Sequence, residues 1–168
     1  NISGMFQGCS SLNISSLPSI FSGVTNMYSM FYGCTSLQNI SLPLSMSNLT
    51  TTSYMFYQCS NLNSVTLPTY APQLTSMDQM CNAATGLTSF VMNSTVASVI
   101  SVSGIFGSCT SLNSVNLSGS SLSNTYINIM FNELPTVASG TIDITDAPGE
   151  PTCTKSIATN KNWTVIPA

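Results

Sequence analysis

Few side chains in this chain of 168 residues can do covalent or acid–base chemistry. Histidine and arginine are absent, so the commonest general base of enzyme active sites is missing. Serines are abundant, but none lies in a nucleophile elbow or beside a residue that would activate it. All five carboxylates lie beyond residue 77, and a pair of them for glycoside hydrolysis is the one catalytic alternative left. We therefore predict that the chain is not an enzyme and that it needs no cofactor.

The cysteines are the next candidates for chemistry, as metal ligands or as disulfides. Four of the six, Cys9, Cys34, Cys59 and Cys109, occupy the same position of an internal repeat and are far apart in the sequence. A zinc site needs close pairs of ligands that converge on one point, which this spacing does not provide. Thiols of neighbouring repeats can come close enough for a disulfide. A buried cysteine is more often a small apolar filler, so we predict packed free thiols and no metal site.

Charge excludes two further classes of function. Only 4% of the residues are charged, the net charge is −3, and the two lysines are Lys155 and Lys161. A nucleic-acid-binding protein needs a basic surface to replace phosphate counterions, and binding to anionic lipid needs one as well. No apolar run reaches the roughly 20 residues that cross a bilayer. We expect neither nucleic-acid binding nor direct membrane insertion.

The elements that would position any site come from the internal repeat. Similar segments begin at a strictly constant interval, at Met5, Met30, Met55, Met80, Ile105 and Met130. The second reads MFYGCTSLQNISLP and the third MFYQCSNLNSVTLP. The fourth and sixth depart from the pattern, because Ala84 and Leu134 replace the cysteine and Cys81 replaces the phenylalanine.

Each unit divides into two predicted elements. Met27, Met30, Phe31 and Cys34 lie at i, i+3, i+4 and i+7, which predicts a short helix with one apolar face. The following NISLP alternates with a period of two, which predicts a short strand that ends at proline. Neither element buries its apolar side alone, but stacked units would pair their strands in parallel and share one core. Rows of like charges would repel each other in such a stack, which accounts in part for the uncharged sequence.

The unit MFxGCxxLxxhxLP, where h is apolar, resembles the BspA-like leucine-rich repeats of bacterial surface proteins. The resemblance covers about residues 1–145 and implies a right-handed α/β solenoid of about six 25-residue units, usually extracellular and often used for adhesion. Residues 146–168 resemble, more weakly, the closing segment of such arrays in bacterial surface proteins and phage tail proteins. They are expected to form a C-terminal cap in which Trp163 and Ile166 cover the core. Because Asn1 lies inside a unit, we expect upstream repeats or domains of a longer chain to precede it.

Two rows of side chains are candidates for a binding face. One is a polar strip of outward-facing strand residues, which includes Ser41, Thr66 and Asn116, with Asn39 and Ser64 beside them. The other contains Tyr32 and Tyr57, which share one repeat position and point away from the core residues of the helix. Exposed tyrosines offer a large contact area at low entropic cost. Plain solvation of a repetitive surface explains either row equally well.

We predict non-catalytic recognition or adhesion at a cell or virion surface, with a protein or glycan as the partner. The alternative is a structural element of a fibre, sheath, stalk or phage tail, which packs against copies of itself or adjacent subunits. A surface with almost no charge lacks the repulsion that keeps proteins apart, so it suits permanent assembly too.

Overall fold

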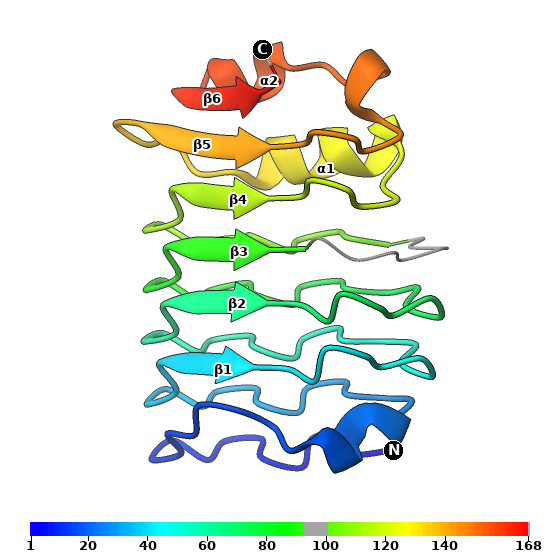
Figure 1. Cartoon of the computed structure of the whole chain (residues 1–168). Helices are drawn as coiled ribbons and strands as arrows, with labels where there is room; N and C mark the ends of the chain where they lie inside the picture. The colour runs from blue at the N-terminus through cyan, green and yellow to red at the C-terminus, as the bar shows by residue number, and fades with distance from the viewer. Residues whose placement is uncertain (93–100, 168) are drawn as a thin grey trace.

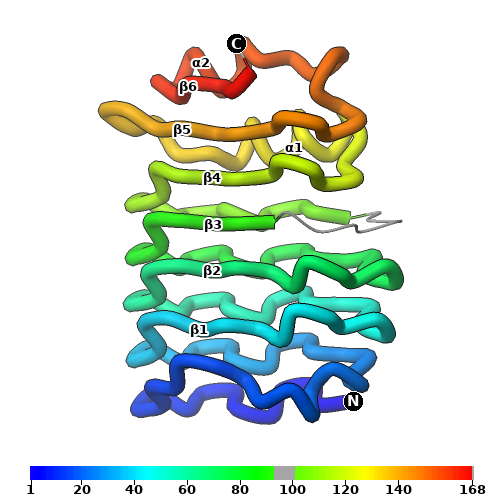
Figure 2. Tube along the Cα trace, viewed as in Figure 1, coloured from blue at the N-terminus to red at the C-terminus, as the bar shows by residue number. Residues whose placement is uncertain are grey.

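The computed structural model describes residues 1–92 and 101–167, which form a stack of similar coils. Figures 1 and 2 show the strands on one side of the stack and the return segments on the other, with the two termini at opposite ends. The six strands are β1 Asn39–Ser41, β2 Ser64–Thr66, β3 Ser89–Val91, β4 Ser114–Asn116, β5 Gly140–Asp143 and β6 Trp163–Ile166. The helical elements are η1 Ser19–Gly23, α1 Asn124–Glu133, η2 Glu150–Thr152 and α2 Ser156–Thr159.

The strands form one parallel sheet in sequence order, β1 to β6. From β1 to β4 each residue pairs with its equivalent in the next repeat, as in Ile40↔Val65↔Phe90. The central residue of each of these three-residue strands is buried, and its two neighbours point away from the core. The predicted solenoid with short parallel strands is therefore confirmed at the level of the repeat and the sheet.

The helix predicted for each unit is wrong for the first five units, where a run of tight turns takes its place. A residue with a left-handed backbone recurs every fourth position, at Ser29 and Gly33 in the second unit, with φ of 53° and 69°. The same two positions are left-handed in four other units: Gly4 and Gly8, Tyr54 and Gln58, Gln79 and Ala83, and Gly104 and Ser108. A helix cannot continue through such residues, although the spacing of the apolar side chains is the same.

Backbone hydrogen bonds explain why the turns are preferred to a helix. Alternate N–H groups close a turn within the coil, as from Met30 to the Met27 carbonyl at 3.1 Å. The N–H groups between them donate to the next coil, as from Phe31 to the Met55 carbonyl at 2.9 Å. A helix would satisfy the same groups internally and would leave nothing to join the coils on this side.

The sixth unit does form the helix, α1. The residues at its two would-be left-handed positions are Ile129 and Glu133, and a β-branched side chain is strongly disfavoured there. Ile127, Met130 and Phe131 face the core. The Lys161 ammonium donates to the carbonyls of Phe131, Asn132 and Leu134, at 3.2, 2.6 and 2.8 Å, which compensates the end of the helix.

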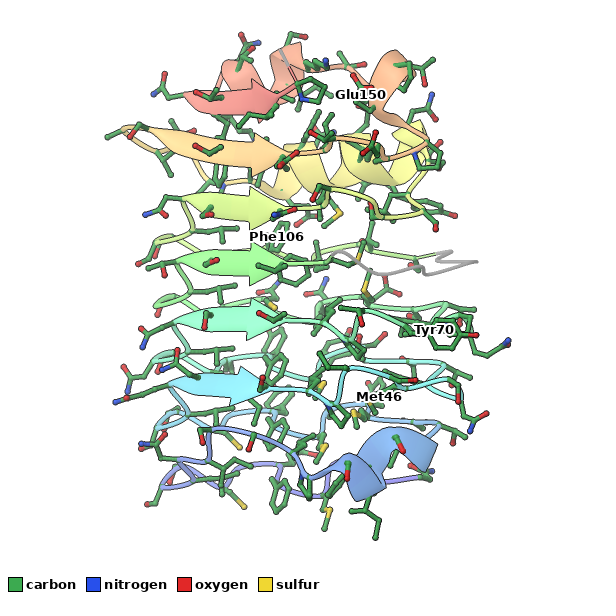
Figure 3. The ribbon with its side chains drawn as sticks, in the orientation of Figure 1. Met46, Tyr70, Phe106 and Glu150 are labelled. Carbon is green, nitrogen blue, oxygen red and sulfur yellow. The ribbon has the colours of Figure 1, made fainter. Side chains whose placement is uncertain are left out.

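The core is a set of columns in which like residues of successive coils lie against each other, and Figure 3 shows the side chains that fill it. The rings of Phe6, Phe31 and Phe56 are stacked, with centroids 5.4 and 5.7 Å apart. The smaller Cys81 interrupts this column, and in the same coil the strand carries Phe90 where other strands have Ile or Val. Phe90 packs edge-on against Phe106 with centroids 5.0 Å apart. We infer that the large side chain on the strand compensates for the small one on the turn.

The C-terminal segment continues the stack by one more strand. β6 pairs with β5 from Gly140↔Trp163 to Asp143↔Ile166. Trp163 is buried and its Nε1 donates to the Pro135 carbonyl at 2.8 Å. Ile166, which the sequence predicts to cover the core, is 41% exposed instead, because it points to the opposite face of β6 from Val165. Placing the solenoid at 1–145 and the cap at 146–168 stays a prediction, and Ala168 lies outside the described residues.

The turn geometry predicts a difference between two glycines. Gly33 has a φ of 69° and Gly23 does not have a positive φ, while an added Cβ would meet only a distant backbone atom at the first and nothing at the second. Gly33→Ala should therefore lower the free energy of unfolding by about 1 kcal/mol through strain alone. Gly23→Ala should be neutral or slightly stabilising, since it only restricts the unfolded chain. Urea unfolding monitored by circular dichroism measures both, and an equal effect of the two variants would contradict the turn assignment.

The compensation between Cys81 and Phe90 predicts a coupling between two core substitutions. Phe90→Val should destabilise the protein by about 2–4 kcal/mol because it leaves a cavity. Cys81→Phe alone should destabilise it through overpacking. The double variant should be more stable than the sum of the two changes by at least about 1 kcal/mol. Additive effects in this double-mutant cycle would show that the two positions do not share one space.

Candidate functional site

Four tyrosines come together on the outer side of the turns, and we call them the tyrosine cluster: Tyr28, Tyr32, Tyr54 and Tyr57. Tyr32 and Tyr57 lie one above the other, with ring centroids 4.9 Å apart and planes 15° apart. Tyr54 lies 5.7 Å from Tyr57 and 5.4 Å from Tyr28, with tilted rings. The repeat therefore places the predicted Tyr32 and Tyr57 side by side, and Tyr28 and Tyr54 extend the same surface.

The tyrosine cluster is partly exposed to solvent, and stacking hides part of its ring area. Tyr32 and Tyr57 each cover one face of the other's ring, because their planes are nearly parallel. Tyr28 is the most exposed member, at 43%, and the other three are half-buried. None of the four hydroxyls forms a hydrogen bond with any residue that the structure describes. These groups are free to donate to and accept from a ligand.

A chain of hydroxyl groups continues this face toward the C-terminus and ends on a carboxylate. Ser53 and Ser76 join their hydroxyls at 2.7 Å, and Ser76 donates to Asp78 at 3.3 Å. Asp78 also accepts from the Ser101 hydroxyl and from the Ser103 N–H, the latter at 2.8 Å. This carboxylate is held by the Ser76 hydroxyl of its own coil and by two groups of the next, so it joins neighbouring coils and is less available to a ligand.

Two amides lie next to Asp78, over two glycines of the following coil. Asn82 donates to Gln79 at 2.6 Å. A Cβ at Gly104 would collide with the side-chain amide of Gln79, and one at Gly107 with that of Asn82. A larger residue at either glycine would displace the amide above it, so the glycines leave room for the amide pair.

The polar strip on the strands is present, but several of its groups already bond each other. The strand register aligns Asn39 with Ser64 and Ser41 with Thr66. Ser64 donates to the Asn39 side-chain oxygen at 3.1 Å. The Asn116 oxygen accepts from the N–H and the hydroxyl of Ser118, at 2.9 and 2.8 Å. Ser41 and Thr66 are exposed, and no side-chain bond is seen for either among the described residues.

The cysteines of the repeat are free thiols, and from the second coil onward they are buried, as the sequence predicts. Cys34, Cys59 and Cys109 each donate at 3.0 Å to a backbone carbonyl of the preceding coil. Burial raises the pKa of Cys34 to about 11 and those of Cys59 and Cys109 to about 12. At neutral pH these thiols are protonated, which makes them poor nucleophiles and poor metal ligands. Cys9 is exposed, contrary to the predicted packing, because it lies in the first coil, and Cys153 is half-buried.

No group of three or more cysteine or acidic side chains converges on one point within residues 1–92 and 101–167. The acids near the C-terminus are dispersed over separate contacts. Asp143 accepts from the N–H and hydroxyl of Thr145, at 2.9 and 2.7 Å. Glu150 forms an ion pair with Lys155 at 3.3 Å.

The repeat also decides the family. The model of the BspA type leucine-rich repeat region matches six copies over residues 3–113, more than half of the chain. The chain belongs to this family. BspA-type proteins are typically surface-associated and generally non-catalytic. No curated protein and no solved structure matches the chain. No helix in the described part of this BspA-type chain is both long enough and apolar enough to cross a membrane.

Two features on the side of the coils where the turns lie were not predicted from the sequence. The network around Asp78 joins neighbouring coils, and the amide pair of Gln79 and Asn82 lies over glycines of the next coil. Writing the chain with one repeat to a row aligns Asp78 under Ser53 and Tyr28, and Asn82 under Tyr57 and Tyr32. That alignment shows which side chains are neighbours, but it does not show that Asp78 accepts from Ser76, Ser101 and Ser103.

The raised thiol pKa values predict a loss of stability at high pH. An unfolded thiol ionises near pH 9, whereas the folded thiols hold their protons to about pH 11 or 12. The stabilisation of the folded protein by its protonated thiols is therefore complete below about pH 9. It declines above that pH, where the unfolded thiols ionise first, and is lost once the pH passes the folded values of about 11 and 12. Urea unfolding between pH 7 and 11 should show this decline, with a smaller pH slope in Cys59→Ala.

The same burial predicts selective alkylation of the native protein. Iodoacetamide at pH 8 should label Cys9 and leave Cys34, Cys59, Cys81 and Cys109 unmodified until urea is added, because only exposed thiolates react. Peptide mass spectrometry locates the modified residues. Labelling of Cys59 in the folded protein would contradict the packed core.

Proposed function

We propose that this chain is a non-catalytic recognition or adhesion module, located outside the cell on a cell or virion surface. The proposed partner is a protein or glycan, and the tyrosine cluster is the binding face. What supports the proposal is that four tyrosines from two successive coils lie together at the surface with hydroxyls that have no partner among the described residues. The right-handed sense of the coil, which the resemblance implies, stays part of this proposal.

The chemistry of the cluster favours contact by hydroxyls and ring edges. Because Tyr32 and Tyr57 stack on each other, a ligand contacts their edges and oxygen atoms instead of lying flat on both rings. Tyrosine combines such hydrogen bonding with apolar area, which is why it is enriched in binding surfaces. The strand strip is the weaker candidate, since Asn39, Ser64 and Asn116 already take part in internal bonds.

A structural role in a fibre, sheath, stalk or tail is the second candidate. The observation in its favour is exposed apolar area where the loops leave the strands: Ile20 is 83% exposed, Leu44 75% and Tyr70 49%. Tyr70 lies at the outer edge of these loops in Figure 3. A surface of this kind with hardly any charge offers little resistance to self-association.

An array of glycans and matrix proteins, read beside the mass of the protein in solution, tests both candidates. We expect saturable binding by a monomer that Tyr32→Phe/Tyr57→Phe weakens at least tenfold, since these changes keep the stacked rings and remove only the hydroxyls. Tyr70→Phe removes an exposed hydroxyl outside the cluster and is the matched control. Circular dichroism checks that each variant is folded.

Two results would contradict the proposal. Full binding by the double variant would exclude the hydroxyls of Tyr32 and Tyr57 as the groups that bind the partner. No binding to any array member, together with a defined oligomer or filament, would favour the structural role instead.

A further inference from the structure

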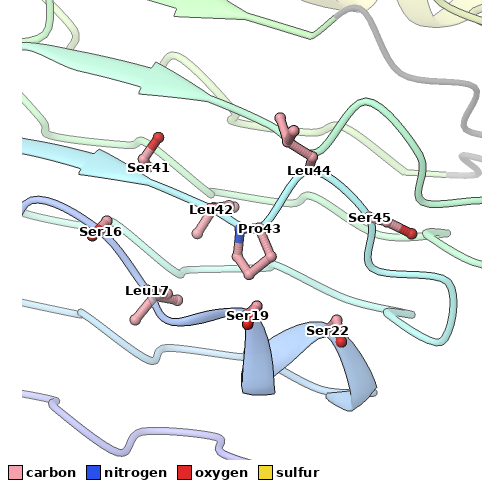
Figure 4. Close-up of a pocket in the computed structure, with 9 residues that line it drawn as sticks. All are labelled: Ser16, Leu17, Ser19, Ser22, Ser41, Leu42, Pro43, Leu44 and Ser45. Atoms are coloured by element: carbon pink, nitrogen blue, oxygen red, sulfur yellow. The ribbon is translucent and has the colours of Figure 1, made fainter.

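A pocket of about 520 Å³ lies between the first two coils, where β1 ends (Figure 4). Leu17, Leu42, Pro43 and Leu44 provide its apolar lining. The rest of the lining is five serines: Ser16, Ser19, Ser22, Ser41 and Ser45. Its size is typical of ligand pockets, and it combines apolar side chains with a few polar groups. None of these residues carries a charge.

The pocket exists because the first coil departs from the pattern of the second and third. In those coils the loops after the strands pair in parallel, with Ser45 opposite Tyr70. The Tyr70 N–H donates to the Leu44 carbonyl at 3.1 Å, and the Met46 N–H donates to the Tyr70 carbonyl at 2.9 Å. In the first coil the corresponding segment winds into η1, where the Phe21 N–H bonds the Pro18 carbonyl at 3.0 Å instead.

This departure leaves one backbone position of the second coil unpaired. In a parallel ladder, the N–H and C=O of one residue both bond the same neighbouring strand. Leu44 and Met46 bond the third coil, so the N–H and C=O of Ser45 point toward the first coil. No described residue bonds either group. Ser45 lines the pocket, and the neighbouring Leu44 side chain is 75% exposed.

We propose that this pocket binds an extended, uncharged peptide segment that pairs in parallel with Ser45. The Ser45 N–H would donate to a carbonyl of the segment, and its C=O would accept from the N–H two residues further on, as Tyr70 does with Leu44 and Met46. An apolar side chain of the segment would contact Leu17 and Leu42. A charged side chain would lose its water without gaining a partner, so an uncharged segment is favoured. This site is separate from the tyrosine cluster and does not depend on it.

The chain itself suggests a probe for this site. Residues 43–49, PLSMSNL, place an uncharged leucine and methionine against the backbone of Tyr70 in the same arrangement. An acetylated and amidated PLSMSNL peptide, titrated into the whole chain with labelled amides, should bind saturably. The amide signals of Ser45, Leu44 and Ser19 should shift most.

Two changes should each weaken binding at least tenfold. N-methylation of the methionine in the peptide removes the N–H that would reach the Ser45 carbonyl. Ser45→Pro removes the donor in the protein, and the fold does not use that N–H. Tyr70→Ser is the matched control, since it changes an exposed side chain on the next coil and should leave the affinity unchanged.

The proposal is overturned if the N-methylated peptide binds as well as the unmodified one, or if the shifted signals lie away from the pocket. Absence of saturable binding up to millimolar peptide overturns it as well. Ser45→Pro counts only if its unfolding midpoint is unchanged, and the N-methylated peptide tests the same bond without altering the protein.

Discussion

The other features of this solenoid depend on backbone hydrogen bonds between neighbouring coils. These bonds join positions that lie about one repeat apart in the sequence. They join the strands on one side and, through alternate N–H groups, the turns on the other. The constant offset places identical residues in contact, which produces the phenylalanine column, the line of thiols and the tyrosine pair. It also makes a column of like charges costly, so the surface is built from hydroxyls and amides.

Departures from this repeat are where the structure acquires individual features. At Cys81 and Phe90 the departure lies inside the core, where a smaller side chain on the turn is accompanied by a larger one on the strand. At α1 the loss of left-handed positions allows a helix, whose carbonyls Lys161 then covers. At η1 the first coil does not form the parallel pairing that joins the second and third coils. The backbone of Ser45 is therefore unpaired, and a pocket lies beside it. The regular coils provide the scaffold, and the irregular ones provide distinct sites.

The two candidate binding surfaces differ in the groups that they offer. The tyrosine cluster offers side-chain hydroxyls and aromatic rings on the side of the coils where the turns lie. The pocket presents the backbone groups of Ser45 among apolar side chains, at the point where β1 ends. Neither contains a charged side chain, so affinity at either site would come from hydrogen bonds and apolar contact, with little dependence on salt.

The sequence by itself determined the repeat, the parallel strands, the buried thiols and the adjacency of Tyr32 and Tyr57, because a strict period and the alternation of NISLP specify which residues share a column. It did not distinguish a helix from a run of turns, since both bury Met27, Met30, Phe31 and Cys34. Only the tertiary structure decided this, because the turns free N–H groups to bond the next coil. For the same reason, the bond between Asn39 and Ser64 and the unpaired backbone groups of Ser45 appear only when neighbouring coils are in place.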